Sequence, residues 1–561
     1  MNVTTKETVC FRRLLSALVV FIVVALFYWP AMRHSFVNYD DNDYVLYNPQ
    51  VLEGLSAKGV AWAATSVGYA WNWHPLTWLS LMTDVSISGS ELRALRSDEP
   101  FPHPPHPEPV QRMSAVMHGH NVLLHAANAA LLFLLMMVLC ERAADATSPK
   151  TTPYQMLVCA LAAGIWAVHP LRAEAVCWIS ERKELLCAFW SLLAIIAHLR
   201  CRRAWLAIVC IALAVAAKPV AVTLPAVMWA LDLVFAGAVR WRRLAVYAAI
   251  SLAGCALTLV AQRGNMADVA LVPLKGRIVN ALAAPAIYLW QTVWPSGLVH
   301  FYPVSESAPL AAVVVGGALW VLGVTFCLRA LMRPSNASGL CVLASCWCLV
   351  CLLPMSGIVQ VGSQLHADRY TYWIGCGLTA CAAMAILGAA ASMRLRARAV
   401  VLAVLAVALV SYSVCGFRQA AVWCDSGTLL KHAYESSDTA KSAADWAEYL
   451  VAEDPAAAER VYRASLARGT VPPALSGLAF LLAVQPNATD FAEAKRLAGK
   501  ALALDGAEHR ARVALGICAI REGRMQDAEK LLSEAVAEDA SDSMASGLLR
   551  QVRARCTPAG K

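Results

Sequence analysis

Two aspartates, Asp40 and Asp41, stand side by side in NYDDNDYVLYNP, directly after the first long apolar segment of the chain. A carboxylate in this place can take the proton of an incoming hydroxyl group, so each of the two is a candidate general base. Its neighbour would hold the base or a cation in position. The other interpretation is a hydrated turn, because carboxylates at a membrane surface need no partner. Both interpretations stay open, as does the choice between the two aspartates.

Aromatic and imidazole side chains follow in WNWHPLTWLS, which contains Trp73 and His74. Aromatic rings suit either a sugar platform or a belt at the membrane interface, and His74 is a candidate for phosphate binding or proton donation. Further along, FPHPPHPEP contains His103 and His106, but its prolines predict an extended linker without convergent metal ligands. The sequence therefore predicts no obligatory cofactor, and a divalent cation is compatible with it.

Three further segments add cations. HPLRAEAVCWISERKELL contains Glu174, Arg182 and Lys183, AAKPVAVTLP contains Lys218, and HADRYTYW contains Arg369. If these segments lie outside the membrane, their cations run against the positive-inside tendency and need an anionic partner. Phosphate is such a partner, because Arg forks and Lys point charges both bind its oxygens. The other interpretation is that the cations pair with the adjacent acidic residues.

The chain that must position these groups is largely apolar. Of its 561 residues, 59% are hydrophobic and 15% are charged, and the mean hydropathy is +0.54. These values exceed those of an average soluble domain, so a large part of the chain lies in lipid. An apolar helix of about 17 to 25 residues crosses a bilayer. We count about eleven such segments, at roughly residues 14–31, 118–140, 155–169, 184–199, 204–217, 220–237, 244–262, 309–328, 338–354, 372–391 and 399–416.

Loop arginines predict the orientation of these spans. The six basic clusters FRR, ER, RCRR, RWRR, RALMR and RLRAR fall on one side if residues 277–295 lie at the surface or re-enter instead of crossing. The N-terminus is then cytoplasmic, and the loops 32–116, 170–183 and 355–371 lie outside together with the C-terminal tail. The first span begins like a signal peptide but lacks a small-residue cleavage site, so we expect it to be retained.

Charge and cysteine usage exclude other classes. The net charge of +9 comes from short clusters at the ends of spans, which indicates topology rather than nucleic-acid binding. Most of the 19 cysteines lie within apolar runs, where they behave as small hydrophobic residues. We therefore expect neither a disulfide framework nor a cysteine metal site.

Beyond the spans the chain becomes rich in Ala, Glu, Asp and Arg. AEAKRLAGKALALD and QDAEKLLSEAVAED superpose at a spacing of 34 residues, which sets Ala494 on Ala528, and a third segment repeats the paired alanines as Ala457 and Ala464. This period is typical of tetratricopeptide repeats, in which small alanines let paired helices approach. The other interpretation is a generic Ala-rich helical tail. We predict an all-α chain with a membrane domain over residues 1–430 and a repeat domain over residues 438–556 that binds an acceptor or a partner protein.

The chain resembles the transmembrane and tetratricopeptide-repeat-containing O-mannosyltransferase family, and its bacterial members, in the order of its segments. These are NYDDNDYVLYNP, WNWHPLTWLS, HGHNVLLHAANAALLFLL, HPLRAEAVCWISERKELL, KPVAVTLP, WPSGLVHFYP, GIVQVGSQLHADRYTY and then the repeats, so the resemblance covers nearly the whole chain. The family belongs to the GT-C superfamily, whose members use a polyprenyl- or dolichyl-phosphate sugar and place an acidic residue of the first outer loop at the reaction centre. Two departures are an insertion, ELRALRSDEPFPHPPHPEPVQRM, and repeats that are few and degenerate.

The resemblance implies a hexosyltransferase of a bacterial inner membrane. Such an enzyme would transfer a sugar, mannose by analogy, from a polyprenyl phosphate to Ser or Thr hydroxyls of a protein on the periplasmic side, with inversion. Asp40 and Asp41 match the family's paired aspartates, and Arg182, Lys183 and Arg369 match basic positions that we assign to the donor phosphate. The remaining candidates are assigned to substrate binding, and they are Trp73, His74, Glu174 and Lys218.

Two other functions stay open. A transporter or flippase for lipid-linked sugars also needs a cationic lumen, and it would show cations deep within its spans and two internally repeated halves. A non-enzymatic membrane scaffold would recruit partners through its repeats, although eleven spans exceed what an anchor needs.

Overall fold

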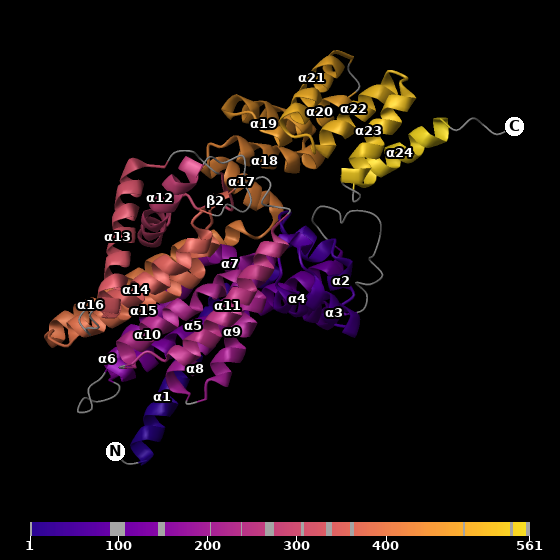
Figure 1. The fold of residues 1–561 in the computed structure, drawn as a ribbon. Helices are drawn as coiled ribbons and strands as arrows, with labels where there is room; N and C mark the ends of the chain where they lie inside the picture. Colours follow the sequence, from indigo (N-terminus) through magenta and orange to yellow (C-terminus); the bar gives the residue numbers. More distant parts are fainter. Residues whose placement is uncertain are drawn as a thin grey trace. The chain divides into compact units, whose positions relative to one another are not determined.

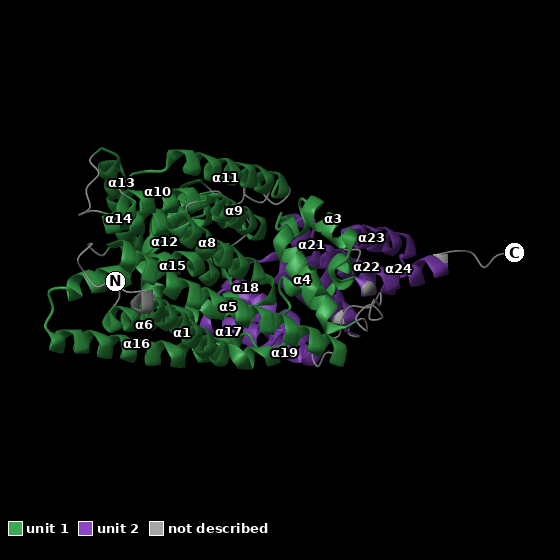
Figure 2. Cartoon of the chain, turned by 90° about the horizontal axis from the view of Figure 1, so that it is seen from below, with its two compact units in different colours: residues 1–92, 107–424 green, residues 93–106, 425–561 purple. Residues whose placement is uncertain are grey.

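The computed structural model describes residues 3–89, 107–143, 152–201, 203–236, 238–263, 274–303, 308–332, 339–358, 364–485, 488–538 and 542–556 (Figure 1). Within them the chain is all-α apart from one short antiparallel pair of strands, β1 (Tyr302–Pro303) and β2 (Gln364–His366). Residues 1–92 and 107–424 form one compact unit, and residues 425–561 belong to a second (Figure 2). We call them the membrane unit and the repeat unit. The predicted all-α fold, a set of apolar spans followed by a repeat part, is confirmed.

Each of the eleven predicted spans falls on a helix of the membrane unit. These helices are α1 (Val3–Tyr28), α5 (Glu108–Ala143), α6 (Pro153–Val168), α8 (Arg182–Arg200), α9 (Trp205–Ala217), α10 (Leu224–Phe235), α11 (Trp241–Ala261), α13 (Leu310–Met332), α14 (Gly339–Ala344), α15 (Thr371–Ala390) and α16 (Leu395–Val422). Residues 277–295 fall mostly on α12 (Leu274–Val293), which carries Pro285 in its interior.

Not every one of these helices can cross a bilayer by itself. Among the described residues, α1, α5, α11, α13, α15 and α16 are the six that are long and apolar enough, and a seventh span results if the bent pair Pro153–Val168 and Pro170–Cys177 counts as one. Helix α9 has 13 residues, which is about 20 Å of rise against a hydrocarbon core of about 30 Å. The chain is thus a multi-pass membrane protein, and the count of eleven stays a prediction for the shorter helices.

The first loop, between α1 and α5, contains short capped helices. They are α2 (Pro49–Leu52), α3 (Ala57–Thr65) and α4 (Pro75–Ser88). The Asn48 side chain accepts from the backbone N–H of Val51 at 3.2 Å, and Ser56 Oγ accepts from that of Gly59 at 3.0 Å. Such side chains satisfy the free N–H groups of a first helical turn, which is why the helices begin there. Most of FPHPPHPEP, including His103 and His106, lies outside the described residues.

The loop between α6 and α8 is buried in the protein, and its expected place on the outer side of the membrane stays a prediction. Every residue from Trp166 to Ala188 is buried, across two 3-10 turns and the short helix α7 (Ala173–Cys177). The ring of His169 accepts the backbone N–H of Leu171 at 3.2 Å and helps to turn the chain. Irregular backbone is stable at membrane depth only when protein surrounds it, so this segment can hold charged groups in place.

Basic clusters meet at one end of the membrane helices. Arg13 of α1 and Arg200 of α8 both pair with Glu141 in the last turn of α5. Arg240, which precedes α11, donates to the backbone carbonyl of His198 in the last turn of α8 at 2.8 Å. The start of α8 lies at the other end of that helix from Arg200. Which side faces the cytoplasm stays a prediction.

The repeat unit is a run of antiparallel helices. They are α17 (Ser426–Ser436), α18 (Ala440–Glu453), α19 (Pro455–Arg468), α20 (Pro472–Val484), α21 (Ala488–Leu504), α22 (His509–Arg521), α23 (Met525–Glu538) and α24 (Ser543–Cys556). Asp425, Thr439 and Asp454 cap α17, α18 and α19 with their side chains. The first helix starts before residue 438, because Asp425 supplies a cap directly after the membrane unit.

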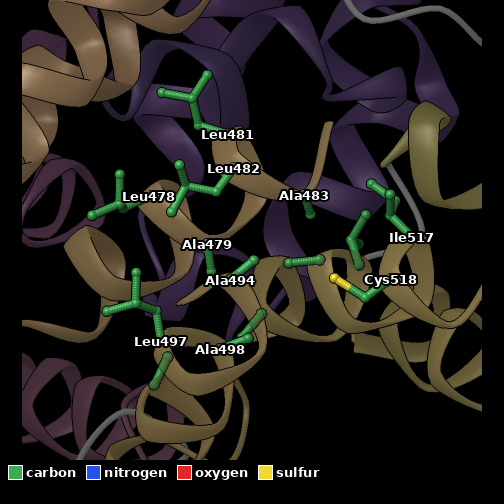
Figure 3. Packing of buried hydrophobic residues seen from close by; sticks show 14 of the residues in the cluster. Leu478, Ala479, Leu481, Leu482, Ala483, Ala494, Leu497, Ala498, Ile517 and Cys518 are labelled. Atoms are coloured by element: carbon green, nitrogen blue, oxygen red, sulfur yellow. The ribbon is translucent and has the colours of Figure 1, made fainter. Parts of the chain in front are cut away.

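The core of the repeat unit consists of leucines fitted against alanines (Figure 3). Leu478 and Leu482 of α20 lie in one buried cluster with Leu497 of α21 and Ile517 of α22. Four alanines predicted to let the helices approach are fully buried, at positions 494, 501, 528 and 535.

The third repeat was predicted one residue out of register. Ala457 and Ala464 are partly exposed, whereas Ala458 and Ser465 are fully buried. Helix α19 starts at Pro455, which makes Ala458 its fourth residue, as Ala528 is the fourth residue of α23. The start of the helix, and not the count of alanines, therefore fixes which face packs.

Candidate active site

Acidic and basic side chains from separate elements converge at the end of the membrane unit where α8 begins. They come from α7, the 3-10 turn Ile179–Glu181, the start of α8, the residue that follows α9, and the 3-10 turn before α15. We call this group the ion cluster, and its members are Glu174, Glu181, Lys183, Glu184, Lys218 and Arg369.

Glu181 is the centre of the ion cluster. Its carboxylate lies 3.2 Å from Lys183 Nζ, 3.1 Å from Lys218 Nζ and 3.2 Å from Arg369 Nε, and the residue is fully buried. Burial alone would raise the pKa of Glu181, but attraction to the three cations outweighs it and lowers the pKa to about 2. Glu181 was not among the predicted site residues. The signal in the sequence was its place in SERKE, beside two cations at the start of an apolar helix.

Lys183 contacts the first loop. Its Nζ donates to the hydroxyl of Tyr44 at 3.2 Å and lies 4.5 Å from the centre of that ring. The ring of Trp178 lies 5.6 Å away on another side. Asp40 Oδ2 is 3.9 Å from the same Nζ, which is an ion pair but longer than a hydrogen bond. Lys183 therefore joins the buried cluster to the candidate base.

Arg369 and Lys218 are held more tightly by acids. Arg369 pairs with Glu174 through its guanidinium, and its backbone N–H donates to the same carboxylate at 2.7 Å. Its guanidinium also lies against the ring of Trp178, 5.3 Å from the centre. Lys218 pairs with Glu184 as well as with Glu181. The pairing of cations with neighbouring acids, one of the two interpretations of these segments, is the arrangement that the structure shows.

The two adjacent aspartates have different environments. Asp41 is buried, and its Oδ1 accepts from Ser180 N at 3.0 Å and from Ser180 Oγ at 2.6 Å, while its Oδ2 accepts from Val37 N at 3.1 Å. Burial raises the pKa of Asp41 to about 6. The side chain of Asp40 is 43% exposed. Asp41 thus fastens the first loop to the turn before α8, and Asp40 remains open to a substrate.

Arg182 does not belong to the ion cluster. Its fully buried guanidinium donates to Asp84 at 2.8 Å, to Ser80 Oγ at 2.8 Å, to the carbonyl of Met117 at 2.7 Å and to Asn121. These partners lie on α4 and α5. Arg182 therefore links α4 and α5, and we assign it no role in binding the donor phosphate.

His74 and Trp73 do not belong to the ion cluster either. The His74 ring is buried, 4.6 Å from the ring of Trp78 and 5.4 Å from that of Tyr44, and burial lowers its pKa well below the ordinary value. A neutral, buried ring supports Tyr44 but is a poor proton donor. Trp73 Nε1 donates to the carbonyl of Ala64 at 3.1 Å, within the first loop.

An apolar cavity of about 320 Å³ opens between α12, α13, α14 and α15. Leu289, Phe326 and Ile374 are among its lining residues, and Thr371 forms part of its wall. The hydroxyl of Thr371 also donates to the carbonyl of Asp368 at 2.7 Å. The cavity therefore borders the segment that carries Arg369. In the described part of the chain, no group of three or more His, Cys, Asp and Glu is placed to hold a metal.

Comparison with known proteins identifies the repeats. The tetratricopeptide repeat family matches residues 488–552. The chain contains tetratricopeptide repeats. No curated protein matches it. Before the matched residues, the helices α18, α19 and α20 continue the same pattern in the structure.

Two solved structures show a weak likeness to this tetratricopeptide-repeat chain. The APC/C hetero-tetramer Cut9–Hcn1 has 12% sequence identity and a TM-score of 0.22, with 88% of this chain and 92% of that chain covered. Yeast Tom70 has 11% identity and a TM-score of 0.22, with 95% of this chain and 97% of that chain covered. Neither TM-score indicates a common fold for the whole chain.

Proposed function

We propose that the chain is a membrane glycosyltransferase that moves a sugar, mannose by analogy, from a polyprenyl phosphate to a hydroxyl of a protein acceptor on the outer side of the membrane. The observation that carries the proposal is the pair formed by Asp40 and Lys183. A half-exposed carboxylate lies 3.9 Å from a buried ammonium group that two further cations accompany. A base beside an anion-binding group is what transfer from a lipid phosphate requires.

In the proposed reaction Asp40 accepts the proton of the acceptor hydroxyl. The hydroxyl oxygen forms a bond to the anomeric carbon, and the bond from that carbon to the phosphate oxygen breaks with its electron pair leaving on the phosphate. Lys183 meets the charge that grows there, with Arg369 and Lys218 behind it. Phosphate is a good leaving group, so no metal is obligatory. The proton on Asp40 then passes to water.

The donor's lipid part needs an apolar surface close to this charge. The cavity between α12, α13, α14 and α15 offers one, because it is lined almost entirely by apolar side chains and borders the segment of Arg369. A prenyl chain placed there would leave its phosphate near the ion cluster. The cavity would orient the prenyl chain rather than drive its binding, because a chain that leaves lipid for an apolar cavity exchanges one apolar environment for another.

The repeat unit is suited to binding the protein acceptor. Tetratricopeptide solenoids present extended surfaces that bind peptides or partner proteins. We assign the repeat unit to recruitment of the protein that receives the sugar.

A transporter or flippase is less well supported. It would need cations within its spans, but Lys183 is the second residue of α8, Lys218 follows the last residue of α9, and Arg369 lies in the turn before α15. A mere scaffold would not need three cations converging on one buried carboxylate.

Transfer itself tests the proposal. The purified protein, in lipid nanodiscs, would be incubated with radiolabelled polyprenyl-phosphate mannose and a periplasmic protein fraction. We expect label on protein with the wild type and none with Asp40→Asn. Asp43→Asn is the matched control, because Asp43 is an exposed aspartate of the same loop, and it should retain transfer. Absence of transfer by the wild type with every polyprenyl-phosphate sugar offered would overturn the proposal.

A further inference from the structure

Three cations from three separate elements meet at one carboxylate. Lys183 comes from α8, Lys218 follows α9 and Arg369 precedes α15, and each has a nitrogen within 3.2 Å of a Glu181 oxygen. Each of the other two glutamates of the ion cluster pairs with a single cation. Glu174 pairs with Arg369, and Glu184 pairs with Lys218. Glu181 is thus the member that links all three cations.

Lys183 and Arg369 differ in the partners that they already have. Lys183 Nζ donates a hydrogen bond to the Tyr44 hydroxyl at 3.2 Å, forms an ion pair with Glu181 at 3.2 Å, and lies 3.9 Å from Asp40, which is beyond hydrogen-bond length. Arg369 donates hydrogen bonds through Nη1 to Glu174 and through Nη2 to Gln364, and its Nε forms an ion pair with Glu181. Lys183 is therefore the cation best placed to contact an anion that arrives beside Asp40.

We infer that Glu181 is a positioning residue, which draws Lys183, Lys218 and Arg369 together and holds the Lys183 ammonium group beside Asp40, where the donor phosphate binds. The inference rests on the proposed function. Without the carboxylate the three cations would repel one another, and Lys183 would lose one of the two partners that fix its direction.

The inference predicts a loss of rate that charge alone would not cause. Replacement of Glu181 by Gln removes a negative charge from the site, so simple attraction would tighten the binding of a phosphate. If Glu181 positions Lys183, the same change leaves phosphate binding unchanged or tighter but misplaces the cation in the transition state. A misplacement of about 1 Å costs about 100-fold in rate. The donor KM and kcat should therefore move apart.

The test measures both quantities in nanodiscs. Transfer kinetics with polyprenyl-phosphate mannose give kcat and the donor KM, and direct binding of polyprenyl phosphate, which needs no transfer, gives an affinity. For Glu181→Gln we expect kcat to fall about 100-fold, with donor KM and polyprenyl-phosphate affinity unchanged or improved. Glu181→Asp keeps the charge on a shorter side chain, and it should restore part of kcat.

Glu141→Gln is the matched control. Glu141 also joins two cations, Arg13 and Arg200, but at the opposite end of the membrane helices. Its replacement also removes a carboxylate that bridges two cations, although the Glu141 side chain is 26% exposed, and kcat should stay at the wild-type value. If Glu181→Gln does not fold, Glu181→Asp decides, because a lowered kcat with an unchanged KM supports the inference and a wild-type kcat overturns it.

The outcomes separate the two proposals. A wild type that neither binds polyprenyl phosphate nor transfers sugar overturns the proposed function and this inference together. A wild type that transfers sugar, with Glu181→Gln equally active, overturns the inference alone. Weaker polyprenyl-phosphate binding by Glu181→Gln at wild-type kcat also overturns it, because Glu181 would then serve binding and not the placement of Lys183.

Discussion

The two units use charged residues in opposite ways. In the membrane unit, Glu181 and Lys183 are buried at the centre of a group of six charged side chains. In the repeat unit, a typical pair is Arg463 with Glu493, whose side chains are 45% and 30% exposed. Buried charges persist only when they are paired, whereas exposed pairs are worth little. We therefore expect substitutions of charge to abolish function in the first unit, and only substitutions of packing to matter in the second.

The sharpest test of this contrast is one substitution made in both units. Lys183→Met should lower kcat/KM for transfer by about 100- to 1000-fold, because it removes the group that meets the leaving phosphate. Lys431→Met replaces an exposed lysine of α17 that pairs with Glu435, and it should leave kcat/KM unchanged. Equal effects of the two variants would contradict the contrast.

Asp41 should make stability depend on pH. Its pKa in the folded protein is about 6 against an ordinary value of 3.8, so the folded state holds the proton more tightly than the unfolded state. This contribution to stability is therefore fully present below about pH 4 and is lost as pH rises through about pH 6, with an upper limit of about 3 kcal/mol. Across this range the melting temperature of the wild type should fall relative to that of Asp41→Asn as the pH rises. A difference that does not change with pH would show that the Asp41 carboxyl does not take up a proton on folding.

In the repeat unit the large effect should come from packing. A Cβ atom at Gly477 would lie 2.3 Å from the hydroxyl of the buried Tyr462, so Gly477→Ala should destabilise this unit by about 1–3 kcal/mol. Amide hydrogen exchange of the full chain would show faster exchange in α19 and α20. Gly499→Ala is the control, since an added Cβ there meets nothing within 4 Å and a helical alanine is favourable. Slow exchange retained in the Gly477 variant would mean that Tyr462 can move aside.

The same contrast explains what the sequence could predict. Spans and repeats follow from local patterns, apolar length and a 34-residue spacing, so helices were found at the predicted places. The candidate active site depends on the directions in which the side chains of neighbouring residues point. Arg182 and Lys183 are consecutive, but successive residues of a helix differ by about 100° in direction. Arg182 therefore turns to Asp84 while Lys183 turns to Glu181.

Adjacent residues outside helices show the same limit. Asp40 and Asp41 could not be told apart in the sequence, because their difference is the contact of Asp41 with Ser180, 139 residues away. Glu181 was missed for a similar reason. Its partner Lys218 is separated from it by 37 residues, and no local pattern shows that this glutamate, and not Glu174 or Glu184, meets three cations.

The smallest expected effect concerns an exposed ion pair of the repeat unit. Arg463 and Glu493 form two parallel hydrogen bonds of 3.0 Å between α19 and α21, a geometry that looks stronger than its exposure allows. Because water and salt screen the pair, Glu493→Gln should cost at most about 1 kcal/mol, and the loss should shrink in high salt. Hydrogen exchange in α19 and α21 at low and high ionic strength would measure it. A loss above about 2 kcal/mol that persists in high salt would mean that charge stabilises the repeat unit in the way it stabilises the ion cluster.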